Sequence, residues 1–149
     1  MSIALIFPGQ GSQYVGMAKA LAETEPIAAE TLALADEVLG FSLSELMADG
    51  PADELTATEN AQPAILAHSI AVLRVMEERL GRVTFSAGHS LGEFSAHVAA
   101  GTFSFSDALK IVRLRGELMR AAGARIPGTM AAILGLSDQV VADVCAGVT

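Results

Sequence analysis

The chain has 149 residues, of which 52% are hydrophobic and 17% are charged, and its net charge is −8. This balance excludes an intrinsically disordered chain, and no apolar stretch approaches the roughly 18 residues that span a membrane. The acidic charge argues against nucleic acid as a partner, and the single cysteine, Cys145, excludes a disulfide framework and a cysteine-based zinc site. We therefore expect a cytoplasmic protein of one domain, or part of one, that binds no metal, membrane or nucleic acid.

The first half of the chain predicts one strand followed by helices. Its elements are a strand at 3–7, helices within 14–48 that break near Pro26 and at 40–42, a loop at 49–57 with at most one helical turn, and a long helix at 59–79. The strand is an unbroken apolar run, which is typical of a strand buried on both faces of a parallel sheet. Thr58 is the candidate cap of the long helix.

The second half predicts strands and helices in alternation. Its elements are a strand at 83–87, a tight turn at 88–92, a helix at 91–100, a helix from Ser106 or Asp107 to about 124, a strand at 128–136, and a helix capped by 137–138 that runs to about 145. This order predicts an α/β fold. The last strand and helix start a unit without partners, so we expect one domain at 1–126 and the start of another at 127–149.

Residues 88–92, Gly-His-Ser-Leu-Gly, match the G-x-S-x-G nucleophile elbow. They lie between a predicted strand and a predicted helix, which is the context that this motif requires. The serine of an elbow lies on a strained turn, so both glycines leave room for the turn and for close packing of strand and helix. Ser90 is therefore the candidate nucleophile, and the amide of Leu91 points where an oxyanion would form. The alternative is that Ser90 only caps the following helix.

A second glycine-flanked loop, residues 9–13 (Gly-Gln-Gly-Ser-Gln), directly follows the first strand. It is not a dinucleotide fingerprint, because Tyr14 stands where that motif needs glycine, and no Gly-Lys-Ser/Thr follows as in a P-loop. Serine acyl-transfer sites commonly take a second oxyanion amide from another strand–helix loop. Gln10 is the candidate donor of that amide. The alternative is a plain turn before a helix.

Charge is distributed unevenly, because residues 110–125 hold five basic side chains and one acidic side chain, whereas residues 1–60 hold ten acidic and one basic. The basic segment is either a solvated helix face or a patch for an anionic ligand or an acidic partner. Arg115 falls on the predicted apolar face of this helix, together with Ala108, Ile111, Val112, Leu118, Met119 and Ala122. A guanidinium there is costly unless it is paired. Its partner is either internal, a carboxylate or helix-end carbonyls, or the carboxylate of a substrate, which the arginine fork matches.

A serine nucleophile normally needs a base, and none of the three histidines is convincing. His89 precedes Ser90 and points away from the turn. His97 lies two helical turns further on, roughly 10 Å away and beyond hydrogen-bond reach. His68 is expected to be a satisfied core histidine. The sequence thus predicts a nucleophile and an oxyanion loop without a base.

Three motifs together resemble the malonyl-CoA:acyl carrier protein transacylase family: Phe7–Gln13 (FPGQGSQ), residues 88–93 (GHSLGE), and Arg115-Gly116 followed by Met119. The resemblance implies an α/β-hydrolase-like parallel-sheet core with an inserted ferredoxin-like subdomain, which starts after about residue 126. It also implies transfer of a malonyl group from malonyl-CoA to the phosphopantetheine thiol of acyl carrier protein, in fatty acid or polyketide synthesis. The coenzyme A thioester is then a substrate, and no cofactor is implied.

By this resemblance, Ser90 is the nucleophile, Gln10 and Leu91 supply the oxyanion amides, Arg115 binds the malonyl carboxylate, and Gln62 lies beside the site. Family members are much longer, and their general-base histidine comes from a half that is missing here. We therefore expect a truncated chain, an N-terminal half whose partner is its C-terminal half. Two alternatives stay open: a serine esterase or thioesterase, and an inactive fragment that needs its other half.

Overall fold

The computed structural model describes residues 2–126, 128 and 133–148. Two strands, β1 (Ile3–Phe7) and β2 (Val83–Gly88), pair in parallel. The helices between them are α1 (Lys19–Thr24), α2 (Pro26–Leu39), α3 (Leu43–Asp49), α4 (Ala52–Thr56) and α5 (Thr58–Met76), with a 3-10 turn at Glu77–Arg79. Helices α6 (Gly92–Ala99), α7 (Phe105–Arg125) and α8 (Asp138–Ala146) follow β2. The predicted α/β fold is confirmed.

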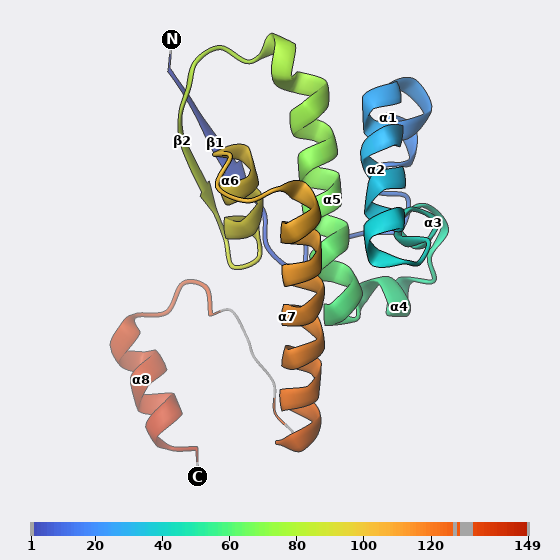
Figure 1. Cartoon of the computed structure of the whole chain (residues 1–149). Helices are drawn as coiled ribbons and strands as arrows, with labels where there is room; N and C mark the ends of the chain where they lie inside the picture. Colours follow the sequence, from blue (N-terminus) through green and yellow to red (C-terminus); the bar gives the residue numbers. More distant parts are fainter. Residues whose placement is uncertain (1, 127, 129–132, 149) are drawn as a thin grey trace.

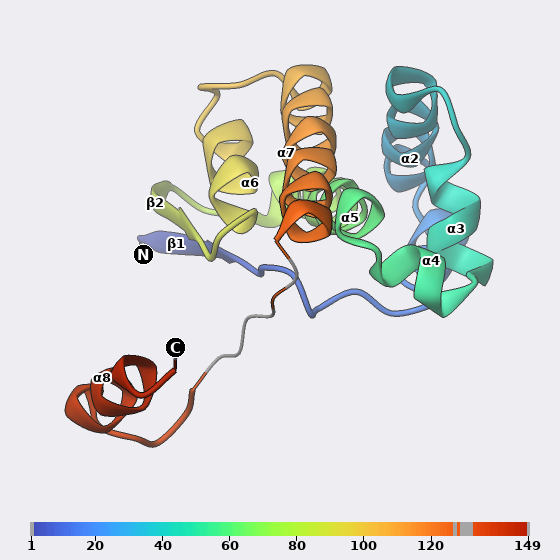
Figure 2. The ribbon, with the colours of Figure 1, turned by 90° about the horizontal axis from the view of Figure 1, so that it is seen from below.

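Helix α5 is the centre of the fold, because α2, α6 and α7 all pack against it. Figures 1 and 2 show the two-stranded sheet with α6 on one side of α5, and α1 to α4 on the other. The largest fully buried apolar side chains come from these elements and include Leu43, Met47, Leu55, Ile65, Leu66, Ile70, Leu91, Leu109 and Val112. The start of α5 is thereby held close to the loop after β1, where Thr58 contacts Gln10, and the residues after α5 lead into the amino end of β2.

Local chemistry explains most helix boundaries. Helix α2 begins at Pro26, a residue well suited to the first helical position, and it ends at Gly40, whose φ of 73° is left-handed. Both predicted breaks in the 14–48 segment are therefore confirmed. The first helix begins only at Lys19, however, because Ala18 also has a left-handed φ of 65°. Helix α4 has five residues, slightly more than the predicted single turn of about 3.6.

The predicted cap of α7 is wrong, and the predicted cap of α8 is confirmed. Helix α7 begins earlier than predicted, because the side chain of Ser104, and not Ser106 or Asp107, accepts the capping hydrogen bond from the amide of Asp107. Helix α8 is capped by Ser137, as predicted. Both caps use a serine oxygen to satisfy an amide that has no partner within its helix.

The prediction that β1 is buried on both faces is wrong. Ile6 of β1 is 76% exposed, and Phe85 of β2 is 74% exposed. Their strand partners, Ala87 and Ala4, place both side chains on the same face of the parallel sheet. The opposite face is the covered one, where the Ser86 hydroxyl donates to the carbonyl of Ala96 in α6. The described helices thus cover one face of the sheet and leave an apolar face open.

The last part of the chain lies beyond the packed helices. The strand predicted at 128–136 falls partly on residues outside the described ones, and the described residues, 128 and 133–136, form no strand. The boundary residue 127 also lies outside the described part. Helix α8 buries no side chain, and both ribbon views show it apart from the other helices. No helix in the described ranges is long and apolar enough to cross a membrane.

Candidate active site

Ser90 lies in the turn between β2 and α6 and has a left-handed φ of 54°, which is strained for a residue with a side chain. A methyl group at Gly88 would lie 1.9 Å from the carbonyl carbon of Gly92, so the turn closes only around glycine. Helix α6 takes Leu91 as its N-cap and has no side-chain capping bond. The alternative that Ser90 is a helix cap is therefore wrong, and the predicted elbow geometry is present.

The loop after β1 packs directly against this elbow. A methyl group at Gly92 would lie 2.5 Å from the carbonyl oxygen of Phe7, and the amide of His89 donates to that same oxygen at 3.0 Å. The loop also closes on itself, because the Ser12 hydroxyl donates to the carbonyl of Gly9 and the side chain of Gln13 accepts from the amide of Gly11, both at 2.8 Å. Ser12 and Gln13 hold the loop in shape beside the serine.

Several backbone amides of the loop and the elbow have no hydrogen-bond acceptor among the residues that the structure describes. The amides of Gln10 in the loop and Leu91 in the elbow are among them. Amides without an acceptor beside a serine hydroxyl are the donors that an oxyanion requires. The oxyanion role expected for Gln10 and Leu91 therefore stays a prediction, as does the plain-turn alternative.

Arg115 of α7 reaches Ser90. One terminal nitrogen of its guanidinium, Nη2, donates to Ser90 Oγ at 3.0 Å, and the other, Nη1, donates to Gln62 Oε1 at 2.5 Å. The guanidinium also lies over the ring of Phe94, 6.0 Å from its centroid. Within the described ranges Arg115 forms no ion pair and no hydrogen bond to a helix-end carbonyl. Both internal partners that the sequence left open are therefore excluded for the described chain.

The apolar face predicted for α7 needs correction. The buried positions are Phe105, Ala108, Leu109, Val112 and Gly116, whereas Ile111 and Leu118 are exposed, and α7 packs mainly against α5. Arg115 lies half-buried at the margin of the buried stripe. Gly116 sets this packing, because a methyl group there would lie 2.5 Å from Glu59 Cα in the first turn of α5. This close approach brings Arg115 within reach of Gln62.

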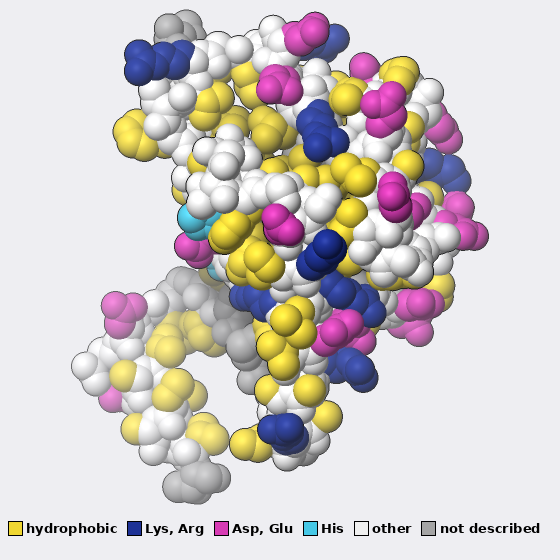
Figure 3. Space-filling view, viewed as in Figure 1, with side chains coloured by type: hydrophobic (Ala, Val, Ile, Leu, Met, Phe, Trp, Pro, Cys, Tyr) yellow, Lys and Arg dark blue, Asp and Glu magenta, His cyan; other side chains and the backbone are white. Residues whose placement is uncertain are grey.

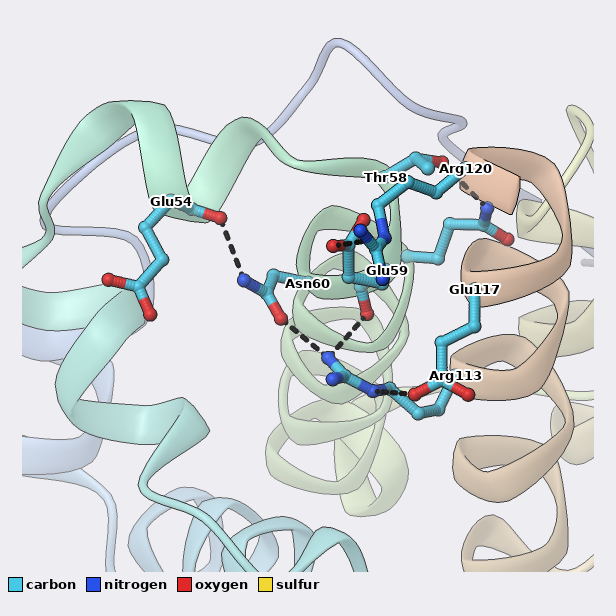
Figure 4. A network of polar contacts seen from close by, with 8 residues as sticks. Glu54, Thr58, Glu59, Asn60, Arg113, Glu117 and Arg120 are labelled. Carbon is cyan, nitrogen blue, oxygen red and sulfur yellow. Dashed lines mark hydrogen bonds and ion pairs between the residues drawn. The ribbon is translucent and has the colours of Figure 1, made fainter. Parts of the chain in front are cut away.

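Two other arginines of α7 bind the start of α5 (Figure 4). Arg113 donates to the carbonyl of Glu59 at 3.0 Å and to Asn60 Oδ1, and it pairs with Glu117. The carbonyl of Glu59 is available because Pro63, four residues later, has no N–H to donate to it. Arg120 pairs with the Glu59 carboxylate at 2.9 Å. Much of the predicted basic patch is thus internal structure that fixes α7 on α5.

Gln62 is fully buried and joins the two sides of the site. Its Nε2 donates to Thr58 Oγ1 at 3.0 Å and to the sulfur of Met119 at 3.3 Å. The Thr58 hydroxyl in turn donates to Gln10 Oε1 at 3.0 Å. Thr58 is therefore not the predicted cap, since Ala57 is the N-cap of α5 and no side chain caps it. Sequence reasoning missed its role, although the spacing of four between Thr58 and Gln62 signals neighbours on one helix face.

A cavity of about 810 Å³ opens in front of these residues. Its polar wall holds Gln10, Thr58, His89 and Ser90, and its apolar wall runs along α7 to Ile126. Figure 3 shows hydrophobic side chains exposed along the lower part of α7. A cavity with one polar, nucleophile-bearing wall and one apolar wall suits a ligand with a reactive polar end and a longer arm.

Among the residues that the structure describes, no histidine forms a hydrogen bond with Ser90. His97 lies 4.0 Å from the Glu93 carboxylate, in the next turn of α6. His68 is half-buried on α5, its Nδ1 has no partner, and burial lowers its pKa. The expectation that His68 is satisfied is therefore wrong. The described residues hold no group of three or more metal-ligating side chains.

A strained serine elbow, a glycine-flanked loop beside it and a half-buried arginine bonded to a buried glutamine are the features expected of an acyl transferase site. Residues 4–147 match the acyl transferase domain model, and the chain belongs to this family. It is 52% identical over 147 residues to the malonyl CoA-acyl carrier protein transacylase of Bacillus subtilis. The matched region covers 99% of this chain and 46% of that protein. The resemblance stated from the motifs is confirmed.

Two solved structures show the same relationship in three dimensions. The acyl-carrier-protein S-malonyltransferase of Burkholderia pseudomallei superposes with a TM-score of 0.89 at 48% identity, over 99% of this chain and 48% of that chain. A malonyl-transacylase in complex with its type II PKS acyl-carrier protein gives a TM-score of 0.88 at 43% identity, over 99% of this chain and 48% of that chain. The chain spans about half the length of the relatives it matches.

Proposed function

We propose that this chain carries the nucleophile half of an S-malonyltransferase, which moves a malonyl group from malonyl-CoA to the phosphopantetheine thiol of acyl carrier protein. The named activity of the relatives supports this proposal, as does the carrier-protein complex of one of them. The reaction serves fatty acid or polyketide synthesis in the cytoplasm. It needs no cofactor, because the activated acyl group arrives as a thioester.

The transfer takes two steps at one serine. Ser90 Oγ attacks the thioester carbonyl, its proton passes to a base, and the carbonyl oxygen becomes an oxyanion that the amides of Gln10 and Leu91 stabilise. The C–S bond then breaks, coenzyme A leaves as a thiol, and Ser90 is malonylated. The carrier-protein thiol attacks this ester in the same way and regenerates Ser90. The left-handed backbone at Ser90 presents the hydroxyl to the cavity, where the thioester is expected to lie.

One observation carries the choice of substrate: the Arg115 guanidinium touches Ser90 Oγ and has no carboxylate partner in the described part of the chain. A malonyl group on Ser90 ends in a carboxylate, which can pair with the guanidinium in the two-toothed geometry that arginine favours. A plain esterase or thioesterase leaves this arginine without a purpose. Gln62 orients the guanidinium through its Nη1.

The base and the rest of the fold are proposed to come from a second half. In this proposal, residues 1–126 belong to an α/β-hydrolase-like core, and residues 127–149 begin a ferredoxin-like subdomain that contains α8. The open sheet face at Ile6 and Phe85 supports it, as does the lack of a hydrogen bond between Ser90 and a histidine in the described part of the chain. The chain by itself is then expected to turn over poorly, because losing a general base costs about 10²–10⁴ in rate.

The test is to add back the other half in trans. The 149-residue chain is mixed with the half of the Bacillus subtilis relative that it does not cover, association is followed by gel filtration, and transfer from malonyl-CoA and from acetyl-CoA to acyl carrier protein is measured. The mixture should associate and transfer malonyl far faster than acetyl. Association without malonyl transfer would refute the proposed activity. Absence of association would refute the proposed second half.

A further inference from the structure

The site contains an unbroken row of hydrogen bonds that no catalytic role so far assigned explains. It runs from Ser90 through Arg115, Gln62 and Thr58 to Gln10, with successive distances of 3.0, 2.5, 3.0 and 3.0 Å. It therefore connects the nucleophile at one end to the oxyanion loop at the other. Thr58, at the first position of α5, is the link between the two.

The chemistry of the side chains fixes the direction of the bonds from Arg115 to Thr58. An arginine can only donate, so the atom of Gln62 that faces Arg115 must be its oxygen. The amide nitrogen of Gln62 then faces Thr58 and the sulfur of Met119, and a thioether can only accept. The Thr58 oxygen accepts from Gln62, and in the structure its hydroxyl donates to Gln10 Oε1.

Resting on the function proposed above, we propose that Thr58 is a positioning residue of the acyl-transfer site. Its hydroxyl anchors the Gln10 side chain, and so the loop whose amide faces the oxyanion, to the same buried glutamine that orients Arg115. The Thr58 hydroxyl, 48 residues from Gln10 in the sequence, thereby couples the oxyanion loop to the carboxylate-binding arginine. Thr58 needs no contact with the substrate to act in this way.

The location of Thr58 is suited to this role. It stands in the first turn of α5, next to Glu59 and Asn60, which Arg113 and Arg120 bind from α7. The backbone that carries Thr58 is therefore held by charged hydrogen bonds from Arg113 and Arg120, which flank Arg115 in the sequence. Its hydroxyl is not used for capping, so it is available to the row.

The test compares Thr58→Val, which keeps the shape of the side chain and removes both hydrogen bonds, with Thr58→Ser, which keeps the hydroxyl. Thr24→Val is the matched control, because the Thr24 hydroxyl bonds only to carbonyls of its own helix. The first readout is NMR of the side-chain amides in ¹⁵N-labelled chain, which has only four glutamines and one asparagine. The second is the rate of Ser90 malonylation at saturating malonyl-CoA, with the second half present.

Thr58→Val should shift the amide signals of Gln10 and Gln62 and speed deuterium exchange at Gln62. It should also lower the malonylation rate by roughly 10- to 100-fold, because small displacements of oriented groups cost this much. Thr58→Ser should restore both readouts to within about threefold of wild type, and Thr24→Val should change neither.

Unchanged glutamine signals in Thr58→Val, or a wild-type malonylation rate, would overturn the positioning role. Equal losses in Thr58→Val and Thr58→Ser would also overturn it, because they would show that the hydroxyl is not what matters. A wild-type chain that takes no malonyl group refutes the proposed function instead. The glutamine signals then decide by themselves whether Thr58 orders the two side chains.

Discussion

The closest approach between helices in the site can be tested with a pair of glycine substitutions on α7. Gly116 faces α5, and a methyl group there would lie 2.5 Å from Glu59 Cα and 2.7 Å from the carbonyl oxygen of Thr58. Gly123 lies on the same helix, and a methyl group there would meet nothing within 4 Å. Both substitutions to alanine gain the same helix propensity, about 1 kcal/mol. Their difference therefore reports the close approach alone.

The size of the effect follows from the distances. Carbon atoms pack best at about 3.5–4.0 Å, so Gly116→Ala must separate α7 from α5 by about 1 Å. The obstructing atoms are backbone and cannot rotate away, which places the cost near the upper end of the 1–3 kcal/mol typical of overpacking, about 3 kcal/mol. After the gain in propensity, Gly116→Ala should be about 2 kcal/mol less stable than wild type. Gly123→Ala should be up to about 1 kcal/mol more stable.

The assay is urea unfolding of the three proteins, followed by far-ultraviolet circular dichroism. The midpoint of Gly116→Ala should fall below that of wild type, and the midpoint of Gly123→Ala should rise above it. Two alanine variants that are equally stabilised would show that α7 and α5 do not approach at Gly116. The positions of Arg115 and Gln62 derived from that approach would then be wrong.

Three further predictions concern single residues. With the second half present, Arg115→Ala should lower the ratio of kcat/KM for malonyl transfer to kcat/KM for acetyl transfer by about 10²-fold. Arg115→Lys should lower this ratio by less, because lysine keeps the charge without the fork. An unchanged ratio would contradict the carboxylate role. Burial lowers the pKa of His68, so the unfolded chain binds its proton first as the pH falls, and stability should drop below about pH 6.5. His68→Leu should flatten this drop in urea midpoints measured at about pH 7.5 and about pH 5.5, and an equal drop would contradict it. Gly88→Ala, with its methyl group 1.9 Å from Gly92, should abolish malonylation of Ser90 in mass spectra, and normal labelling would contradict the elbow packing.

The sequence predicted the elements whose signals are local. The apolar run of β1, the break at Pro26, the glycine at 40 and the elbow at 88–92 all depend on neighbouring residues, and the structure has them within a few positions. The elbow could be predicted in physical detail, because a strained serine demands small residues two positions away on either side. The same local logic identified Ser137 as a cap.

Side-chain burial and contacts that depend on tertiary packing could not be predicted from the sequence. The exposure of Ile6 depends on which helices cover the sheet, and the strand's own composition carries no information about that. The buried stripe of α7 is rotated from the predicted one because it includes Gly116, which a hydrophobicity pattern does not count and which lies close to Glu59 of α5. The sequence suggests Thr58 as a cap because its partners, Gln10 and Gln62, come together only in the fold.

Malonylation of Ser90 is the central claim, and intact-mass spectrometry tests it most directly. The chain, with the second half present, is incubated with malonyl-CoA, and wild type is compared with Ser90→Ala. We predict an added mass of about 86 Da on wild type, located by peptide mapping to the elbow, and none on Ser90→Ala. Equal labelling of Ser90→Ala, or no labelling of wild type in the associated protein, would contradict the account.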